Sequence, residues 1–228
     1  MKAGSFPAKA NVLAQRVFYE SILQPLMKKA KKRRSKDVLL FIDGSHNIFG
    51  GDYLGYVYGV YRRFTKTFSG RQRLSVLACL NYVTKKVSKV ATEDYITALT
   101  VCELLRKVAL EYAGKTVHII ADNARYQKCA VVMNLANELG IKLYFLPAYS
   151  PNLNLIERLW KHVKSQLRTQ RYDAFEDFKM GIMSILESTH KKSKAQIDKL
   201  IGESVQLFDS LVPLNESTYV DMRKKKVA

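Results

Sequence analysis

Three acidic residues, Asp43, Asp122 and Glu157, are spaced so that their carboxylates can meet in a folded chain. Asp43 directly follows the apolar run 38–42. Asp122 follows a second apolar run, 117–121, and Glu157 follows a turn rich in Pro and Asn. Carboxylates at the ends of neighbouring buried strands can hold two Mg²⁺ or Mn²⁺ ions, because these cations prefer oxygen ligands and their charge must be offset. The spacing therefore indicates two-metal phosphoryl transfer.

The charge of the chain indicates an anionic partner. Its 228 residues carry a formal net charge of +18, with dense basic blocks at 28–36 and 223–226. Each block is consistent either with a nucleic-acid contact or with a solvated linker or tail. The remaining positive charge is spread through the body of the chain, so the tails alone do not account for it. Together with the acidic trio, this charge predicts a nucleic acid as the substrate.

The composition is typical of a folded intracellular protein. A hydrophobic fraction of 47% with 11% aromatic residues is sufficient for a core. No apolar run approaches the roughly 20 residues of a membrane span, and the N-terminal sequence lacks the apolar stretch of a signal peptide. The scattered Cys79, Cys102 and Cys129 match neither a disulfide framework nor a zinc pattern. We therefore expect reduced thiols, a cytoplasmic location and no membrane association.

The first half of the chain predicts a helix followed by an antiparallel meander. Residues 11–30 have helical spacing, which Pro25 is expected to kink. Runs typical of strands follow at 38–42, 55–61 and 74–80. The next stretch, up to Val90, either pairs with the last of these strands or leaves the sheet.

The second half predicts alternating helices and strands. Thr92 is the expected N-cap of a helix that ends at Gly114. After it we expect strand 117–121, a helix over 125–139 closed by Gly140, strand 141–146, and helices over 155–168, 174–190 and 193–207.

These elements predict an α/β fold with a mixed five-stranded sheet flanked by helices. The first three strands are expected to be antiparallel, and the last two parallel to the first because helical crossovers connect them. Asp43 and Asp122 would then lie at the carboxyl ends of adjacent parallel strands, where open α/β sheets bind their ligands.

Three local strings resemble one protein family. They are SGRQR at 69–73, ADNAR at 121–125 and PAYSPNLNLIERLW at 147–160. Thirty-four residues separate Asp122 from Glu157. The strings, this spacing and the expected strand order resemble the mariner-type superfamily of DDE transposases, and within it the bacterial insertion-sequence branch.

The resemblance implies a ribonuclease-H-like DDE catalytic domain over residues 37–190. An N-terminal helix and basic linker (1–36) would precede it, and a C-terminal helix and basic tail (191–228) would follow. The implied activity is metal-dependent DNA cleavage and strand transfer in cut-and-paste transposition. The implied partners are transposon ends and target DNA, engaged by a homodimer in the bacterial cytoplasm, on nucleoid DNA.

The resemblance also assigns residues. Asp43, Asp122 and Glu157 would form the catalytic triad that binds two Mg²⁺ or Mn²⁺ ions. A capping box with Asn154, or an ion pair with Lys161, is the structural alternative for Glu157. We expect His46 to be a loop or packing residue and Trp160 to lie in the core. The candidate DNA contacts, each with a solvated or structural alternative, are Arg71, Arg73, Arg125, Lys128, Arg158, Lys161, Lys164 and Arg168.

Two departures from the family pattern leave other functions open. Gly44 follows Asp43, where many relatives have a Glu. The helix-turn-helix domains of the family have no room before residue 36, so the chain resembles the catalytic half alone, as a trimmed form or the product of a split or truncated element. The alternatives are a structure-selective DNA nuclease, and a non-catalytic DNA-binding remnant that represses a full-length transposase.

Overall fold

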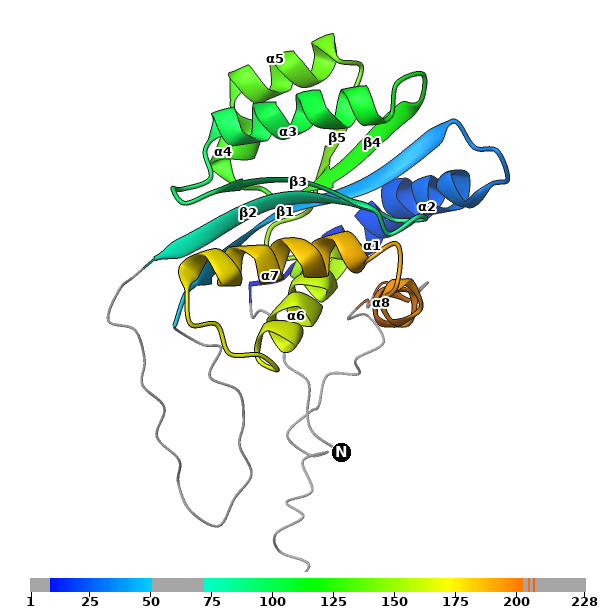
Figure 1. Ribbon diagram of the computed structural model, residues 1–228. Helices are drawn as coiled ribbons and strands as arrows, with labels where there is room; N and C mark the ends of the chain where they lie inside the picture. The colour runs from blue at the N-terminus through cyan, green and yellow to red at the C-terminus, as the bar shows by residue number, and fades with distance from the viewer. Residues whose placement is uncertain (1–8, 51–71, 203–204, 206, 208–228) are drawn as a thin grey trace, which may run out of the picture.

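A mixed five-stranded sheet forms the centre of this computed structural model, which describes residues 9–50, 72–202, 205 and 207. The strands occur in the order β3-β2-β1-β4-β5 across the sheet (Figure 1). Their bounds are β1 Asp37–Ile48, β2 Arg73–Asn81, β3 Val87–Thr92, β4 Thr116–Ala121 and β5 Lys142–Phe145.

The pairing confirms the predicted sheet. β1 pairs antiparallel with β2, and β2 pairs antiparallel with β3. β4 lies parallel to β1, and β5 lies parallel to β4. The segment 87–92 therefore stays in the sheet as its third strand, while the predicted strand at 55–61 lies outside the described residues.

Alternating side chains divide the core into two layers, one on each face of the sheet. Leu40 and Ile42 of β1 face a cluster formed with helices α3 (Ala98–Glu111) and α5 (Ala130–Glu138). Leu39 and Phe41 face the opposite cluster. Because strand side chains alternate between faces, the continuous apolar run of β1 is buried on both sides. Figure 1 shows the two helical layers above and below the sheet.

Most of the helical residues cover the second face. Its helices are α1 Val12–Phe18, α2 Gln24–Lys31, α6 Ile156–Leu167, α7 Phe175–Ser188 and α8 Lys194–Ile201. Within the described residues, no helix has the length and apolar character needed to cross a membrane.

The kink expected at Pro25 takes the form of a π-helical segment, η1 (Tyr19–Leu23), between α1 and α2. The backbone N–H of Gln24 bonds to the carbonyl of Tyr19, five residues earlier. Pro25 itself has no N–H to donate, so the wider turn lets the helix continue into α2 without a break.

Several boundaries differ from the sequence-based expectation, among them the end of α8, which lies at Ile201 and not at residue 207. Thr92 is the last residue of β3, and α3 begins instead after Thr97, which forms a capping box with Thr100. The helix predicted over 125–139 is divided into α4 (Arg125–Lys128) and α5 by extended backbone at Cys129. β1 runs on to Ile48 because β2 continues to pair with it beyond Asp43.

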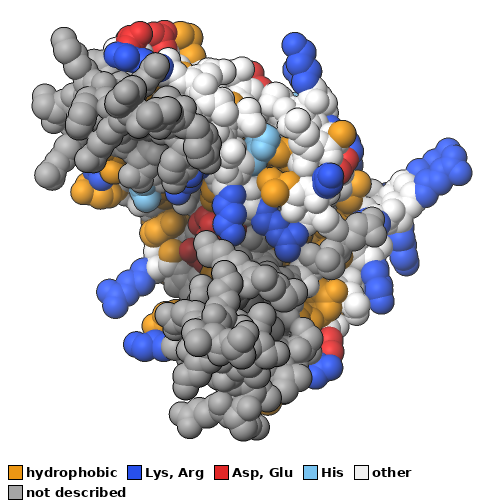
Figure 2. Space-filling model, turned by 90° about the horizontal axis from the view of Figure 1, so that it is seen from below, with side chains coloured by type: hydrophobic (Ala, Val, Ile, Leu, Met, Phe, Trp, Pro, Cys, Tyr) orange, Lys and Arg blue, Asp and Glu red, His pale blue; other side chains and the backbone are white. Residues whose placement is uncertain are grey.

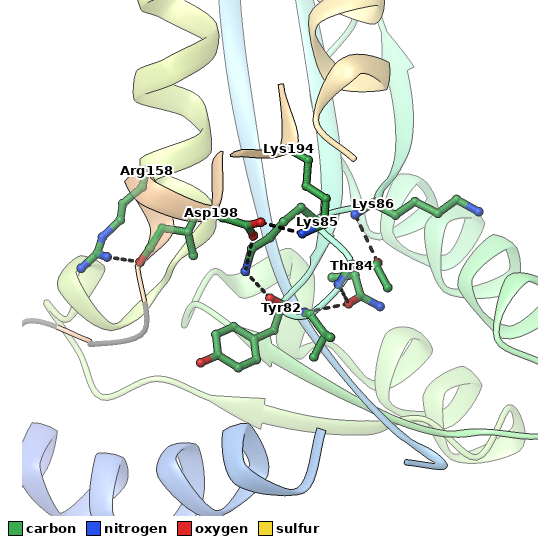
Figure 3. A network of polar contacts seen from close by, with 10 residues as sticks. Tyr82, Thr84, Lys85, Lys86, Arg158, Lys194 and Asp198 are labelled. Carbon is green, nitrogen blue, oxygen red and sulfur yellow. Dashed lines mark hydrogen bonds and ion pairs between the residues drawn. The ribbon is translucent and has the colours of Figure 1, made fainter. Parts of the chain in front are cut away.

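The last helix is fastened to the sheet by a polar network (Figure 3). Lys85 lies in the β2–β3 turn, where its ammonium donates to the Tyr82 carbonyl and lies 3.8 Å from the Asp198 carboxylate of α8. The Arg158 guanidinium of α6 donates to the carbonyl of Ile201 at the end of α8. Ile201 is fully buried, so α8 shares the core of the sheet.

Candidate functional site

The strand register brings Asp43 and Asp122 to the same place on the sheet. Phe41 pairs with Ile120 in the parallel β1–β4 ladder. The same offset, continued for two residues, sets Asp43 beside Asp122. Phe41 faces the α6 layer, and side chains two apart in a strand share a face, so Asp43 points toward that layer. Asp122 directly follows β4 and lines the same cavity as Asp43. Neighbouring strands lie about 4.8 Å apart, so the two carboxylates start from adjacent positions.

Glu157 reaches the same place from helix α6. The amide of Asn154 donates a 3.1 Å hydrogen bond to the carbonyl of Ile42, the residue before Asp43. This bond ties the chain just before α6 to the strand that carries Asp43. No side chain caps the start of α6, so the capping box that offered a structural role for Glu157 and Asn154 is not formed.

The three carboxylates line one cavity of about 260 Å³. The loop 146–151, which leads from β5 toward α6, forms another part of its wall. Folding therefore gathers side chains from β1, from the end of β4 and from α6, although they are distant in the sequence. Asp43 was predicted to end its strand; it lies within β1, but just beyond the last residue of β1 that pairs with β4.

The electrostatics of this cavity oppose full ionisation. Burial, and then the charges of Glu157 and Asp122, raise the pKa of Asp43 to about 7. Burial also raises the pKa of Asp122, against a hydrogen bond from the Ala124 N–H. Burial raises the pKa of Glu157, while the nearby Lys161 and Lys164 act in the opposite direction. Crowded, partly desolvated carboxylates of this kind are stabilised by a bound cation.

The donor set fits a hard divalent cation. All three side chains offer carboxylate oxygens, which Mg²⁺ and Mn²⁺ prefer. In the described part of the chain, no three His, Cys, Asp or Glu side chains already stand as the ligand set of one metal ion. Asp43, Asp122 and Glu157 line one cavity, so these are the residues that would hold a cation there.

Trp160 contacts the site in a way that sequence reasoning missed. Its ring is buried as predicted, but its indole N–H also donates a 3.0 Å hydrogen bond to Oδ2 of Asp43. The available sequence signal was that Trp160 lies one helical turn after Glu157, on nearly the same side of α6. The bond favours the ionised form of Asp43 and holds one of its two oxygens.

Tyr126 was also missed. Burial and the charges of Asp122 and Asp43 raise the pKa of Tyr126 to about 12, so its hydroxyl stays protonated and can donate near both aspartates. Gly44, which departs from the family pattern, lies close to Tyr126. A Cβ at position 44 would lie 2.6 Å from Cδ1 of Ile96 and 3.7 Å from the Tyr126 hydroxyl, so the tip of the Ile96 side chain would have to move to admit a Glu.

We expect Trp160→Phe to move metal binding to higher pH. Losing a hydrogen bond to a charged group costs roughly 1.5–3 kcal/mol, so the pKa of Asp43 should rise by about one unit or more. Calorimetric titration with Mn²⁺ between pH 5 and 9 would measure the shift. Val163→Ala is the control, because it removes buried packing on α6 without touching Asp43. Equal pH profiles for Trp160→Phe and the wild type would contradict this role.

The candidate DNA-contacting residues fall into three groups. Lys161 and Lys164 are exposed on α6, and Arg168 is exposed directly after it. The two lysines lie close enough to Glu157 to affect its pKa. On the face seen from below, Figure 2 shows Lys and Arg side chains near acidic ones. Arg158 is engaged with the end of α8 through its hydrogen bond to Ile201.

The other candidates that the structure describes belong to elements other than α6. The guanidinium of Arg73 lies 3.6 Å from the ring centroid of Tyr95, and the ammonium of Lys128 lies 5.0 Å from that of Phe145. Arg125 is exposed at the start of α4, and Arg71 lies outside the described residues. His46, expected to be a loop or packing residue, is in β1, with Nδ1 2.9 Å from the Ser75 hydroxyl. A role in DNA binding stays a prediction for all eight candidates.

Comparison with known proteins gives a family and a fold. A family model described as DDE superfamily endonuclease matches residues 51–179, a range that contains Asp122 and Glu157 and begins after Asp43. No protein with a curated description matches the chain in sequence.

Several solved structures are similar. The catalytic domain of Mos1 mariner transposase has a TM-score of 0.59 at 15% identity, covering 88% of this chain and 94% of that one. A Mos1 transposase paired-end complex with the left transposon end has a TM-score of 0.58 at 17% identity, covering 89% and 68%. A Mos1 catalytic domain with raltegravir and Mg has a TM-score of 0.55 at 14% identity, covering 90% and 100%. At these identities the likeness shows a ribonuclease-H-like fold.

Proposed function

The chain belongs to the DDE superfamily endonuclease family, and from this premise we propose that it is the catalytic domain of a transposase that cleaves DNA and joins the cut strand to a target. The observation that carries the proposal is the convergence of Asp43, Asp122 and Glu157 on one cavity. The net charge of +18 supports a nucleic acid as the substrate.

We propose that Asp43, on the central strand, together with Asp122 and Glu157 would hold two Mg²⁺ or Mn²⁺ ions. When bound, such ions would acidify a water or 3′-hydroxyl nucleophile and offset charge on the phosphodiester. A similar Mos1 catalytic domain was solved with Mg, which supports this choice of metal.

The remaining residues of the site position its substrate and its acids. Lys161 and Lys164, exposed beside Glu157, would bind the phosphates that flank the reacting one. The indole of Trp160 keeps one oxygen of Asp43 in place. The hydroxyl of Tyr126 would donate to a carboxylate or to substrate oxygen near both aspartates. Exclusion of water by the burial around Asp43 strengthens each of these interactions.

We extend this proposal to the branch of the family, the partners, the location and the domain organisation. The string at 147–160 supports the bacterial insertion-sequence branch, and with it transposon ends and target DNA as partners, a homodimer in the transposition complex, and action in the bacterial cytoplasm on nucleoid DNA. A catalytic domain over 37–190, with flanking segments 1–36 and 191–228, is the domain organisation we propose.

The test is a strand-transfer assay with Mn²⁺ and DNA labelled at a free 3′-end. We expect the label to become joined to a second DNA, and we expect both cleavage and joining to stop when EDTA removes the metal. Cleavage without joining would instead identify a structure-selective nuclease that uses the same cavity. Tight DNA binding that weakens steeply with salt, without Mn²⁺ binding, would identify a non-catalytic DNA-binding remnant and contradict the proposal.

A further inference from the structure

The loop at the mouth of the acidic cavity holds one residue in an unusual conformation. Tyr149 lines the cavity and has a φ of 57°, which is the left-handed region. For a residue with a large side chain this conformation costs roughly 1–2 kcal/mol, and Gly would remove the cost. The tyrosine is nevertheless 53% exposed, so burial of the ring does not account for its presence.

The loop around Tyr149 is braced from helix α1. The side chain of Gln15 is almost fully buried, and its amide donates a 3.4 Å hydrogen bond to the carbonyl of Tyr149. The oxygen of the same side chain accepts a 2.9 Å hydrogen bond from Asn152. Prolines stand at positions 147 and 151, where their rings restrict the backbone. The ring of Tyr149 is thus presented from a rigid backbone, so little conformational entropy is lost when something packs on it.

We propose that the ring of Tyr149 is a stacking platform for an unpaired nucleobase next to the phosphodiester held by the acidic cavity. The inference rests on the proposed function and adds a feature of the substrate, an unstacked base beside the reacting phosphate. An aromatic ring that stacks on a base contributes roughly 1–3 kcal/mol whatever the base. A base within a duplex has both faces covered, so an exposed ring at this place favours DNA whose strands are separated near the cut.

The experiment uses the full chain carrying Asp122→Asn, so that binding is measured without cleavage. The probe is a duplex with a short frayed end whose first unpaired base is 2-aminopurine, because this base loses fluorescence when it stacks. We expect the Asp122→Asn protein to quench the probe. Adding Tyr149→Ala should abolish the quenching and weaken binding of the frayed duplex by about 5- to 150-fold. Binding of a fully paired duplex should change little.

Three further variants test whether the aromatic ring itself causes the quenching. Tyr149→Phe keeps the ring and removes the hydroxyl. It should quench like the parent if the ring stacks on the base, and it should lose the quenching if the hydroxyl acts by binding phosphate. Tyr149→Gly accepts the positive φ, so it should fold at least as stably while still losing the quenching. Gln15→Met removes the brace and should reduce quenching in part. Leu110→Ala, an exposed apolar residue of α3 on the other side of the sheet, is the matched control.

The outcomes separate this inference from the proposed function. Quenching that survives Tyr149→Ala, or that Tyr149→Phe removes as completely as Tyr149→Ala, would overturn the platform. If that happens while the wild-type protein still cleaves and joins DNA, the proposed function stands. A wild-type chain that neither cleaves DNA nor quenches the probe would overturn both.

Discussion

Asp122→Asn is expected to retain the fold and DNA affinity of the wild type while losing Mn²⁺-dependent cleavage by roughly a thousandfold or more, as with other catalytic residues that act as a unit. The change replaces one carboxylate oxygen by an NH₂ group of about the same size, so the packing at the end of β4 is kept. It removes the negative charge that the site would need for a divalent cation. Cleavage of a labelled duplex, measured beside DNA affinity and thermal unfolding, would test this.

Asp177→Asn is the matched control, because it makes the same chemical change on an exposed position of α7. We expect it to cleave DNA like the wild type. If Asp122→Asn nicks DNA at the wild-type rate, Asp122 has no part in the mechanism, and the assignment of the acidic cavity as the active site loses its basis.

Asp43→Asn is expected to stabilise the metal-free protein at pH 8. Burial and neighbouring carboxylates raise the pKa of Asp43 from 3.8 to about 7 in the folded state. At pH values below 3.8 both states are protonated and the residue has no effect. Between the two pKa values only the unfolded state ionises, so the free energy of unfolding falls as pH rises and then levels off above pH 7. This decrease in the free energy of unfolding, on the order of 4 kcal/mol at most, should be absent from Asp43→Asn.

Urea unfolding in EDTA, followed by the fluorescence of the single Trp of the chain, would measure this difference at pH 4 and pH 8. The stability gained by Asp43→Asn should be largest at pH 8 and nearly absent at pH 4. Added Mn²⁺ should stabilise the wild type more than the variant. Asp37→Asn is a control in which the change in stability should have the opposite sign. A hydrogen bond from His118 lowers the pKa of Asp37, so replacing this carboxylate should lower the free energy of unfolding at pH 8. A variant less stable than the wild type at pH 8 would contradict the argument.

Local patterns predicted the sheet and most of its helices. The apolar runs of β1 and β4 were recognisable because strands buried on both faces are continuously hydrophobic. Helix α6 was recognisable because Ile156, Trp160 and Val163 recur at helical spacing. The error at Thr92 has a local cause too. Thr92 and Thr97 are both good N-caps. Thr92 pairs with β2 as the last residue of β3, so the helix begins only after Thr97.

The sequence by itself determined that acidic residues would follow two buried apolar runs and stand near the start of a later helix, because periodicity and turn residues specify such local order. Only the tertiary structure decided what surrounds those acids. The hydrogen bond from Trp160 to Asp43, the hydroxyl of Tyr126 and the brace from Gln15 to Tyr149 join residues from separate elements. Such contacts depend on how α1 and α6 cross the sheet, and that crossing is set by the packing of the whole core, which no local pattern encodes.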